Sequence, residues 1–319
     1  MRRLRIRLNA GFSGPHAGFF LAAADGHLAR AGIEVEYLPG KGAAAVVADL
    51  EDGDADLAYG DLSALILRLA HEAPGRGPAA VFVGFNRTPL TVAVTADGPI
   101  QHPADLAGHR ISGHARDAAL IVFPALAHAA GIDAASVRIL PSEASLAEQV
   151  RRMLEEDAAD GVFGFPNTII ASLAAARLPL AHRLRFLNYA DHLPGLYGNA
   201  LIASRHLLDR EPGLLRGLVG AVARGFASAV AEPERGVEAI RAAAPSIDLA
   251  IDTQRWRGTI AAEMAHPEGA ALGIGDAQPA RLAQGIAQLA EALRLPRAPS
   301  PGEVFTAEFL PPLAERRFA

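Results

Sequence analysis

The order of strand-like and helix-like segments is repeated along the first part of the chain, and this repeat constrains the fold most. The first 90 residues and the next hundred each contain a strand, a glycine-containing loop, an alanine-rich helix and two further strands. In the first copy these two strands end at Leu38-Pro39 and Tyr59-Gly60. In the second copy they end at Leu140-Pro141 and Phe163-Gly164. The alternation predicts an α/β fold with a largely parallel sheet. The repeat predicts two similar lobes, although any two strand-helix-strand stretches can look alike.

The remainder of the chain indicates how the lobes are connected. A strand-like segment over 195–203 follows the second copy, and the chain beyond Ser204 reads as mainly helical. We therefore expect residues 1–92 and 199–319 to form lobe 1 and residues 93–198 to form lobe 2. The chain would cross between them near Leu90–Val94 and Tyr197–Ala203, and these crossings would act as a hinge. A ligand cleft is expected between the lobes, beyond the carboxyl ends of the strands.

Composition excludes several kinds of chemistry. The 319 residues include no cysteine, so disulfides, thiolate zinc sites, iron–sulfur clusters and thiol nucleophiles are ruled out. The 30 Lys plus Arg and 35 Asp plus Glu give a formal net charge of -5, which argues against nucleic acid or an anionic membrane as a partner. Charge-free apolar stretches fall short of the ~18 to 20 residues that span a bilayer, so no transmembrane helix is expected.

The N-terminal residues bear on the compartment. Leu4 to Leu8 alternate between apolar and basic residues directly after Met-Arg-Arg, which is typical of a strand and not of an export signal. We expect either a periplasmic protein whose signal peptide has been removed or is absent from this chain, or a cytoplasmic protein.

Candidate binding residues lie in the loops that follow the predicted strands. His16 lies where a helix begins and could bind an anion, or it could face water. Arg87 could clamp an anion or form a salt bridge across the hinge. The Ser112 loop could hold an anion, or Ser112 could simply cap a helix. Several aromatic residues could form a cage around a planar ring. The full expected set is Phe12, Ser13, His16, Phe19, Tyr59, Gly60, Asp61, Ser63, Arg87, Ser112, Gly113, His114, Arg116, Phe163, Phe165, Asn167 and Tyr197.

Signatures of enzymes and of bound cofactors are absent from the sequence. The histidines have no H-x₃-H or H-E-x₂-H spacing, so no metal site is expected. Ser13 lies outside any G-x-S-x-G motif, and no glycine run matches a dinucleotide or phosphate loop. We therefore expect no catalytic residue and no cofactor.

Four segments resemble the NMT1/THI5-like (SsuA/THI5-like) family, the solute-binding proteins of ABC importers. The segments are Gly18–Glu36, Leu50–Asp56, Asp105–Gly108 with Ile111, and Leu196–Ile202. The resemblance implies a two-lobe, hinged periplasmic-binding-protein-like (type II) fold with parallel-rich mixed sheets. It also implies a small-molecule ligand and an ABC transporter permease as partners, and we expect a monomer.

The departures from the family pattern narrow the expected function. Binders of pyrimidine precursors of thiamine usually have an acidic residue on the helix that corresponds to Asn167–Ile170, and this segment has no carboxylate. A thiamine precursor is therefore a less favoured ligand. Pyrimidine synthases and desulfinases that resemble this fold need cysteine. We expect a protein that binds a small planar heteroaromatic or anionic solute, such as a pyrimidine, a sulfonate or an aromatic acid. The alternative is a cytoplasmic enzyme similar to menaquinone-pathway lyases, with His16, Asp61 or His114 as acid or base.

Overall fold

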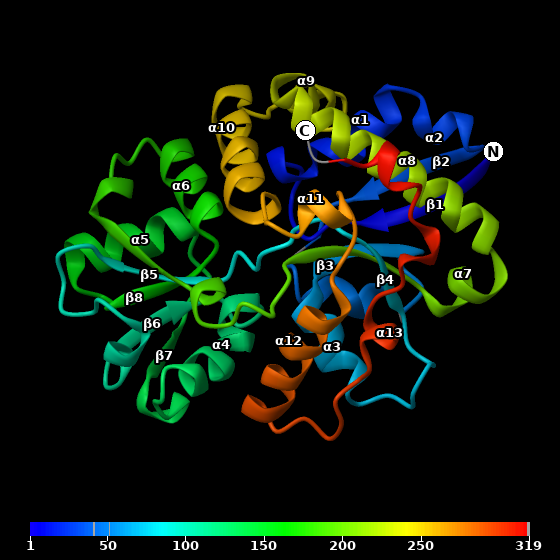
Figure 1. Ribbon diagram of the computed structural model, residues 1–319. Coiled ribbons are helices and arrows are strands. Elements are labelled where there is room, and N and C mark those ends of the chain that lie inside the picture. Colours follow the sequence, from blue (N-terminus) through cyan, green and yellow to red (C-terminus); the bar gives the residue numbers. More distant parts are fainter. Residues whose placement is uncertain (41, 51, 318–319) are drawn as a thin grey trace.

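Two five-stranded sheets form the framework of the computed structural model, which describes residues 1–40, 42–50 and 52–317 (Figure 1). Glu51, within one of the family-like segments, lies outside them. The first sheet has the order β2 (Ile33–Leu38), β1 (Arg2–Arg7), β3 (Leu57–Asp61), β10 (Asn199–Ala203), β4 (Ala79–Val83). The second has the order β7 (Arg138–Pro141), β6 (Arg110–Gly113), β8 (Gly161–Gly164), β5 (Thr91–Thr95), β9 (Leu184–Asn188).

The two sheets share one topology. In each, the first three strands of the order pair in parallel, and the fourth, β10 or β5, is antiparallel to both of its neighbours, so the fifth runs in the same direction as the first three. β5 is the first strand of the second sheet in chain order and directly follows β4 of the first sheet. β10 directly follows β9 of the second sheet and returns the chain to the first. This arrangement confirms the predicted two-lobe type II fold with mixed sheets. We call each sheet with its covering helices a lobe.

The chain crosses between the sheets through residues 84–90 and 189–198. β5 and β10 lie wholly inside the second and first sheets, so the two connecting segments precede these strands and do not include them. The crossings predicted near Leu90–Val94 and Tyr197–Ala203 therefore lie earlier in the chain than expected. The reason is that the sequence pattern marks apolar strands clearly but not the irregular residues before them. The role of the crossings as a hinge stays a prediction, as do the lobe boundaries at 92/93 and 198/199.

Most helices belong to the first lobe. Those around the first sheet are α1 (Ala17–Ala24), α2 (His27–Arg30), α3 (Leu62–Leu69), α7 (Arg205–Arg210), α8 (Pro212–Ala231), α9 (Pro233–Glu238), α10 (Leu249–Thr259), α11 (Gly269–Leu272), α12 (Pro279–Ala292) and α13 (Pro301–Val304). The second sheet is covered by α4 (Ala118–Ala129), α5 (Leu146–Glu156) and α6 (Pro166–Ala175). Short helical turns that matter below are η1 (Gly14–His16), η2 (Ala45–Leu50) and η8 (Ile260–Met264).

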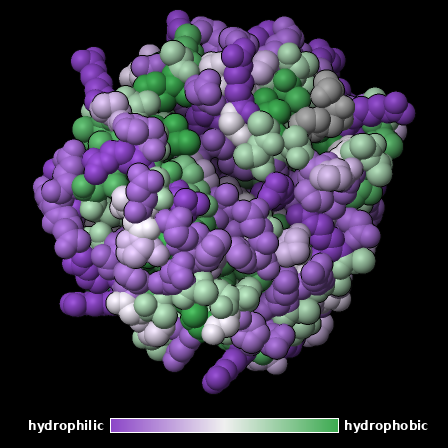
Figure 2. Space-filling view, turned by 60° about the vertical axis from the view of Figure 1, so that its left-hand side comes forward, coloured by the Kyte–Doolittle hydropathy of each residue, from purple (hydrophilic) through white to green (hydrophobic). Residues whose placement is uncertain are grey.

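Helix α8 is the one described helix that is long and apolar enough to cross a membrane, by length and composition only. Here it packs along α1, and ten of its 20 residues are buried. A helix in the core of a large lobe is apolar on several sides and has the same composition. On the face drawn in Figure 2, hydrophilic residues cover most of the surface and apolar residues form small groups.

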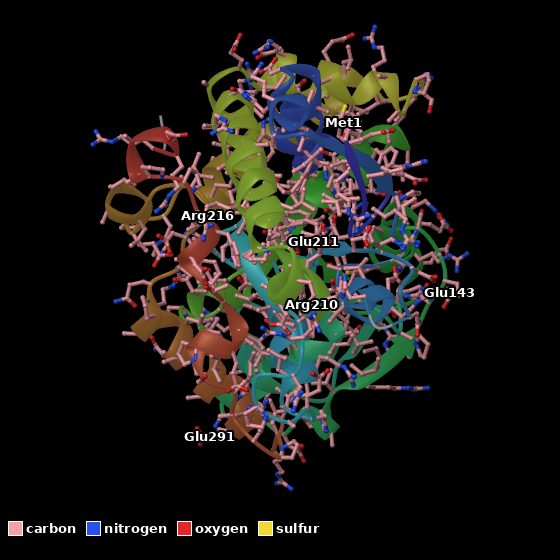
Figure 3. All side chains as sticks on the ribbon, turned by 90° about the vertical axis from the view of Figure 1, so that its right-hand side faces the viewer. Met1, Glu143, Arg210, Glu211, Arg216 and Glu291 are labelled. Atoms are coloured by element: carbon pink, nitrogen blue, oxygen red, sulfur yellow. The ribbon has the colours of Figure 1, made fainter. Side chains whose placement is uncertain are left out.

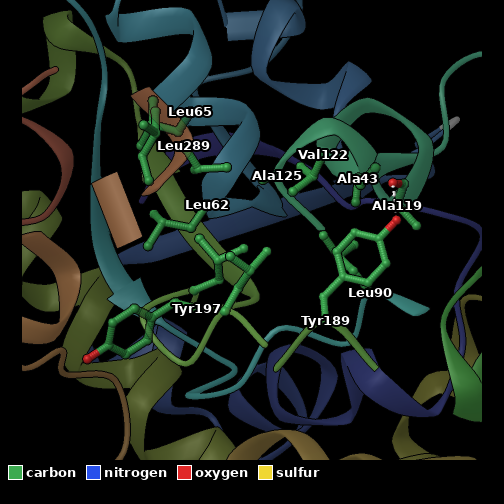
Figure 4. Close-up of a cluster of buried hydrophobic side chains, with 14 of the residues drawn as sticks. Ala43, Leu62, Leu65, Leu90, Ala119, Val122, Ala125, Tyr189, Tyr197 and Leu289 are labelled. Atoms are coloured by element: carbon green, nitrogen blue, oxygen red, sulfur yellow. Dashed lines mark hydrogen bonds between the residues drawn. The ribbon is translucent and has the colours of Figure 1, made fainter. Parts of the chain in front are cut away.

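One apolar core runs through both lobes. It joins Leu62 and Leu65 of α3 and Leu289 of α12, all in the first lobe, to Val122 and Ala125 of α4 in the second (Figure 4). We call this contact of α3, α12 and α4 the apolar seam. The lobes also meet at a second place, through α6 and α10, which lie side by side in Figure 1.

Candidate functional site

A cavity of about 320 Å³ lies between the lobes, where the parallel strands of both sheets end. The segments after β1 and β2 line it from the first lobe, and those after β6, β7 and β8, including the starts of α4, α5 and α6, line it from the second. Helix α10 adds one residue. The lining residues are Asn9, Ala10, Gly11, Gly40, Gly42, Ala43, Arg116, Asp117, Ala118, Leu146, Gly164, Phe165, Thr168 and Arg255. We call this cavity the cleft.

Three helices of the second lobe begin at the cleft. Asp117 and Ser145 cap the N-termini of α4 and α5 with their side chains. The N-cap residue of α6, Phe165, offers no side-chain cap. Among the described residues, the backbone N–H groups of Asn167 and Thr168 in its first turn have no acceptor. Free N–H groups and the positive end of a helix favour a negatively charged ligand.

Two guanidinium groups add positive charge to the cleft. Arg255 donates from Nη2 to the Thr168 hydroxyl at 2.9 Å, and its buried Nε has no partner in the part of the chain that the structure describes. Burial lowers the pKa of Arg255, and Asp252 and Glu263 act in the opposite direction. Within the described chain, the exposed Arg116 side chain forms no hydrogen bond or ion pair. Of the described residues that line the cleft, Asp117 alone has a carboxylate, so this lining favours a ligand with negatively charged oxygens.

His16 lies behind the cleft wall and does not line it. Its Nδ1 accepts from the backbone N–H of Ser13 at 3.2 Å, and its Nε2 lies 2.6 Å from Oδ1 of Asn9. Burial, together with the charge of Arg255, lowers the pKa of His16 to about 3. The imidazole is therefore neutral and cannot attract an anion by charge. Ser13 is buried beside it as the N-cap of η1.

Asp61 is buried beneath the first-lobe side of the cleft. Its Oδ1 caps α3 by accepting from the Ala64 N–H at 3.2 Å, and among the described residues its Oδ2 has no hydrogen-bond partner that meets the geometric limits. Burial raises the pKa of Asp61 to about 7. Gly60 packs against the carbonyl of Ala43, and Ser63 is buried in the first turn of α3. These three residues shape the wall without lining the cleft.

Aromatic residues expected to form a cage are distributed over separate cores. Phe19 and Tyr59 are fully buried in the first lobe, with ring centroids 4.8 Å apart. Phe12 packs on Phe20 nearby, and Phe163 packs on Phe123 in the second lobe. Tyr197 donates to Glu268 and accepts from Gln278 N–H. Phe165 is the one aromatic residue of the expected set among those that line the cleft.

The remaining expected residues hold the second lobe and the crossings together. Ser112 donates to Gln149 at 2.7 Å, and Gly113 leaves room for the Phe163 ring. Nε2 of His114 lies 2.8 Å from the carboxylate of Glu143, which projects from the edge of the molecule in Figure 3. These contacts are internal to the second lobe.

Arg87 and Asn167 join segments that are distant in sequence. Arg87 pairs with Asp191 at 3.1 Å, so the two crossings are linked by a salt bridge, the second of the two roles considered for Arg87. Asn167 donates to the buried Glu263 at 2.9 Å and thereby connects α6 to η8. Burial raises the pKa of Glu263 to about 7.

Arg116 and Phe165 are thus the expected residues that line the cleft. Asn9, Gly11, Thr168 and Arg255 line it as well but were missed. Asn9 to Gly11 directly follow the first predicted strand, and Thr168 lies one residue beyond Asn167, so position in the pattern could have found them. Arg255 has no such signal, because α10 follows the repeated region by some 50 residues and reaches the cleft only in the fold.

Comparison with known proteins identifies the family. The model of the family described as NMT1/THI5 like matches residues 13–236. The chain belongs to the NMT1/THI5-like family. No curated protein matches the sequence. The match ends before α10, so Arg255 lies outside the part of this family member that the family model covers.

Solved structures share the fold of this family member at low sequence identity. A protein from Bordetella bronchiseptica RB50 has a TM-score of 0.71 and 15% identity, over 97% of this chain and 96% of that one. The periplasmic aliphatic sulphonate binding protein SsuA from Escherichia coli has a TM-score of 0.69 and 15% identity, over 95% of this chain and 97% of that one. The alkanesulfonate-binding protein SsuA from Xanthomonas axonopodis pv. citri, bound to MOPS, has a TM-score of 0.67 and 16% identity, over 95% of this chain and 98% of that one.

An enzyme has the same fold. A cysteine-to-serine variant of DszB in complex with biphenyl-2-sulfinic acid has a TM-score of 0.60 and 16% identity, over 97% of this chain and 98% of that one. DszB is described as a desulfurization enzyme. The fold of the NMT1/THI5-like chain is therefore compatible with reversible binding and with catalysis, and the residues of the cleft must distinguish them.

Proposed function

We propose that this protein is the solute-binding component of an ABC importer and that it binds a small organic anion in the cleft. The observation that carries the proposal is the set of donors around one cavity between two lobes: Arg255, Arg116 and the free N–H groups of α6. A solute that contacts both lobes favours the closed arrangement, which a permease can recognise. A periplasmic location and an ABC permease as partner belong to the same proposal, in line with the SsuA proteins of this fold.

The lining residues favour one part of the expected ligand range. Phe165, Leu146 and Ala10 supply an apolar surface beside the donors, so an anionic head with a small apolar or planar part suits the cleft. One aromatic ring at the cleft supports stacking on one side only. Sulfonates and aromatic acids fit this description better than an uncharged pyrimidine.

Binding can be tested by calorimetry and thermal shift with a panel of sulfonates, aromatic carboxylates and pyrimidines. A hit at ~100 times its Kd adds about 2.7 kcal/mol to stability. Arg255→Met is expected to weaken binding of that hit by about 100-fold, because a charge-assisted hydrogen bond is lost in a part-buried site. Arg116→Met should raise the Kd for that hit by only about tenfold, since this side chain is exposed and its charge is screened by solvent and salt.

Arg177→Met supplies the matched control. Arg177 is an exposed arginine after α6 that lines none of the cleft, so the same change of charge there should leave the Kd within twofold. Binding that is strongest for uncharged pyrimidines, or that survives Arg255→Met unchanged, would contradict the anion site.

A second candidate function is catalysis on the same fold, and Asp61 is the observation that favours it. Its raised pKa is a property of a general acid or base, but its carboxylate is fully buried beneath the wall, so catalysis would require the wall to open to the solute. His16 and His114, the other candidates, each have ring nitrogens engaged by protein groups. Thiol chemistry is excluded because the chain has no cysteine. Recovery of a bound solute chemically unchanged after long incubation supports binding, whereas turnover that Asp61→Asn abolishes supports an enzyme.

A further inference from the structure

We infer that His16 is a positioning residue that turns the side-chain amide of Asn9 so that its N–H groups face the cleft. The inference deepens the proposed function and rests on it for the choice of solute. Two contacts carry it, from Ser13 N to His16 Nδ1 at 3.2 Å and from His16 Nε2 to the Asn9 amide at 2.6 Å.

The direction of the chain of hydrogen bonds follows from its first member. A backbone N–H can only donate, so Nδ1 of His16 accepts from Ser13 and carries no proton. A neutral imidazole then holds its single proton on Nε2, and Nε2 must donate. The atom of Asn9 that it meets is therefore the oxygen, Oδ1. This argument fixes the orientation of the amide by bonding logic alone, although the oxygen and nitrogen of an amide look alike.

The surroundings of His16 keep this arrangement in place. The imidazole is 1% exposed, and its ring meets the Tyr59 ring edge-on with centroids 6.2 Å apart. The turn that carries it is held by Asp252, which accepts from the Gly14 N–H at 2.8 Å. Burial and the nearby Arg255 both disfavour a second proton on the ring. His16 therefore stays neutral, with its proton on Nε2, at physiological pH.

The orientation of Asn9 sets what the first lobe offers to a solute. Asn9 lines the cleft, and within the described residues its Nδ2 has no hydrogen-bond partner. The first lobe thus presents an N–H₂ donor opposite the donors of Arg116 and the α6 N-terminus. A carboxylate or sulfonate oxygen can accept from all of them. A carboxamide or sulfonamide places an N–H where an acceptor is required, so His16 acts on specificity through Asn9 without touching the solute.

The protonation state can be read directly from the protein without solute. In ¹⁵N-labelled protein, His16→Asn assigns the imidazole signals by their loss. We expect long-range ¹H–¹⁵N correlations of His16 that are typical of a neutral ring protonated at Nε2, unchanged between pH 5 and 8. A proton on Nδ1, or titration of His16 within that range, would overturn the inference.

Variants test the consequence for Asn9 and for the solute. Gln at position 16 can place an amide oxygen and an amide nitrogen near the positions of the two ring nitrogens, so His16→Gln should preserve the side-chain amide resonances of Asn9. His16→Leu offers neither group and should shift them. The probes are two pairs, benzenesulfonate with benzenesulfonamide and benzoate with benzamide. His16→Leu should lower the anion-to-amide affinity ratio by about tenfold, and His16→Gln should keep it within about twofold.

Exposed His206 supplies the control, and His206→Gln should leave the ratio unchanged. An unchanged ratio in folded His16→Leu, or unchanged Asn9 resonances, would contradict the positioning role. If the wild type bound neither anion, the proposed anion site would fail, while the tautomer measurement would still decide the arrangement of Ser13, His16 and Asn9.

Discussion

Individual buried titratable residues make the stability of this protein depend on pH in opposing ways. The pKa of His16 falls from 6.5 to about 3, so the unfolded chain binds a proton there that the folded protein excludes between these values. Stability from His16 is present above pH 6.5 and is lost as the pH falls. The pKa values of Asp61 and Glu263 rise from 3.8 and 4.5 to about 7. Their contribution is present below pH 4 and is lost as the pH rises to 7.

Asp61→Asn isolates one of these contributions. Asparagine is neutral at every pH, so it has no such pH-dependent loss. The free energy of unfolding of the variant should therefore rise relative to that of the wild type by about 1.4 kcal/mol for each pH unit between 4.5 and 7. Urea denaturation at pH 4.5, 5.5 and 7 measures this difference. Asp54→Asn, at an exposed carboxylate, is measured at the same pH values as the control for the loss of a surface charge. A constant difference for Asp61→Asn would mean that Asp61 is ionised throughout this range.

At the scale of elements, the crossing of α1 and α8 depends on a glycine. A Cβ atom at Gly225 would lie 2.2 Å from the backbone oxygen of Gly18 and 2.6 Å from Cβ of Ala22, so the two helices would have to move apart. Gly225→Ala should therefore lower the free energy of unfolding by about 1–3 kcal/mol. Guanidinium denaturation followed by circular dichroism measures this.

Gly213 of the same helix is the matched control. A Cβ atom there meets nothing within 4 Å, and alanine has the higher helix propensity, so Gly213→Ala should leave stability unchanged or raise it by less than about 1 kcal/mol. Equal effects of the two substitutions would argue against a close crossing of α1 and α8. The apolar composition of α8 is thereby explained by its packing in the first lobe.

Across the whole molecule, the apolar seam predicts that the lobes unfold together. Leu289 is fully buried where α12 meets α4, and Leu289→Ala should cost about 2–5 kcal/mol. Fluorescence of Trp256, which reports on the first-lobe side, and far-ultraviolet circular dichroism should give coincident transitions before and after the substitution. Ile170→Ala, at a side chain that is 38% exposed on α6, should cost far less. Separate transitions in the wild type would mean that the seam does not couple the lobes.

The two contacts between the lobes differ in chemistry. Parting the seam exposes leucine and valine side chains, whereas the α6–α10 side is joined by hydrogen bonds from Asn167 to Glu263 and from Arg255 to Thr168. Water can replace hydrogen bonds at a modest net cost but does not compensate exposed apolar area. Exposing the seam to water therefore carries a cost in apolar area that breaking these two hydrogen bonds does not.

Local patterns in the sequence determined the elements, their order and the class of fold. Strands such as Leu57–Asp61 are short apolar runs bounded by turns, and a repeated order of such elements leaves few compact arrangements. Positions just after strands also indicated Arg116 and Phe165, because parallel strands place their carboxyl ends at one edge of the sheet.

Only the tertiary structure decided which side chains line the cleft. Tyr59 and Phe163 lie near the ends of β3 and β8, close to the position of Phe165, but packing buries both rings in the lobes. Whether a side chain at a strand end faces the core or the cleft depends on the elements that cover it. For His16 the sequence left two roles open, binding an anion or facing water, and the fold gives it neither: it is a buried neutral group behind Asn9, because burial disfavours its charged form. Arg255 reaches the cleft from α10, and contacts between residues so far apart in the chain leave no local trace in the sequence.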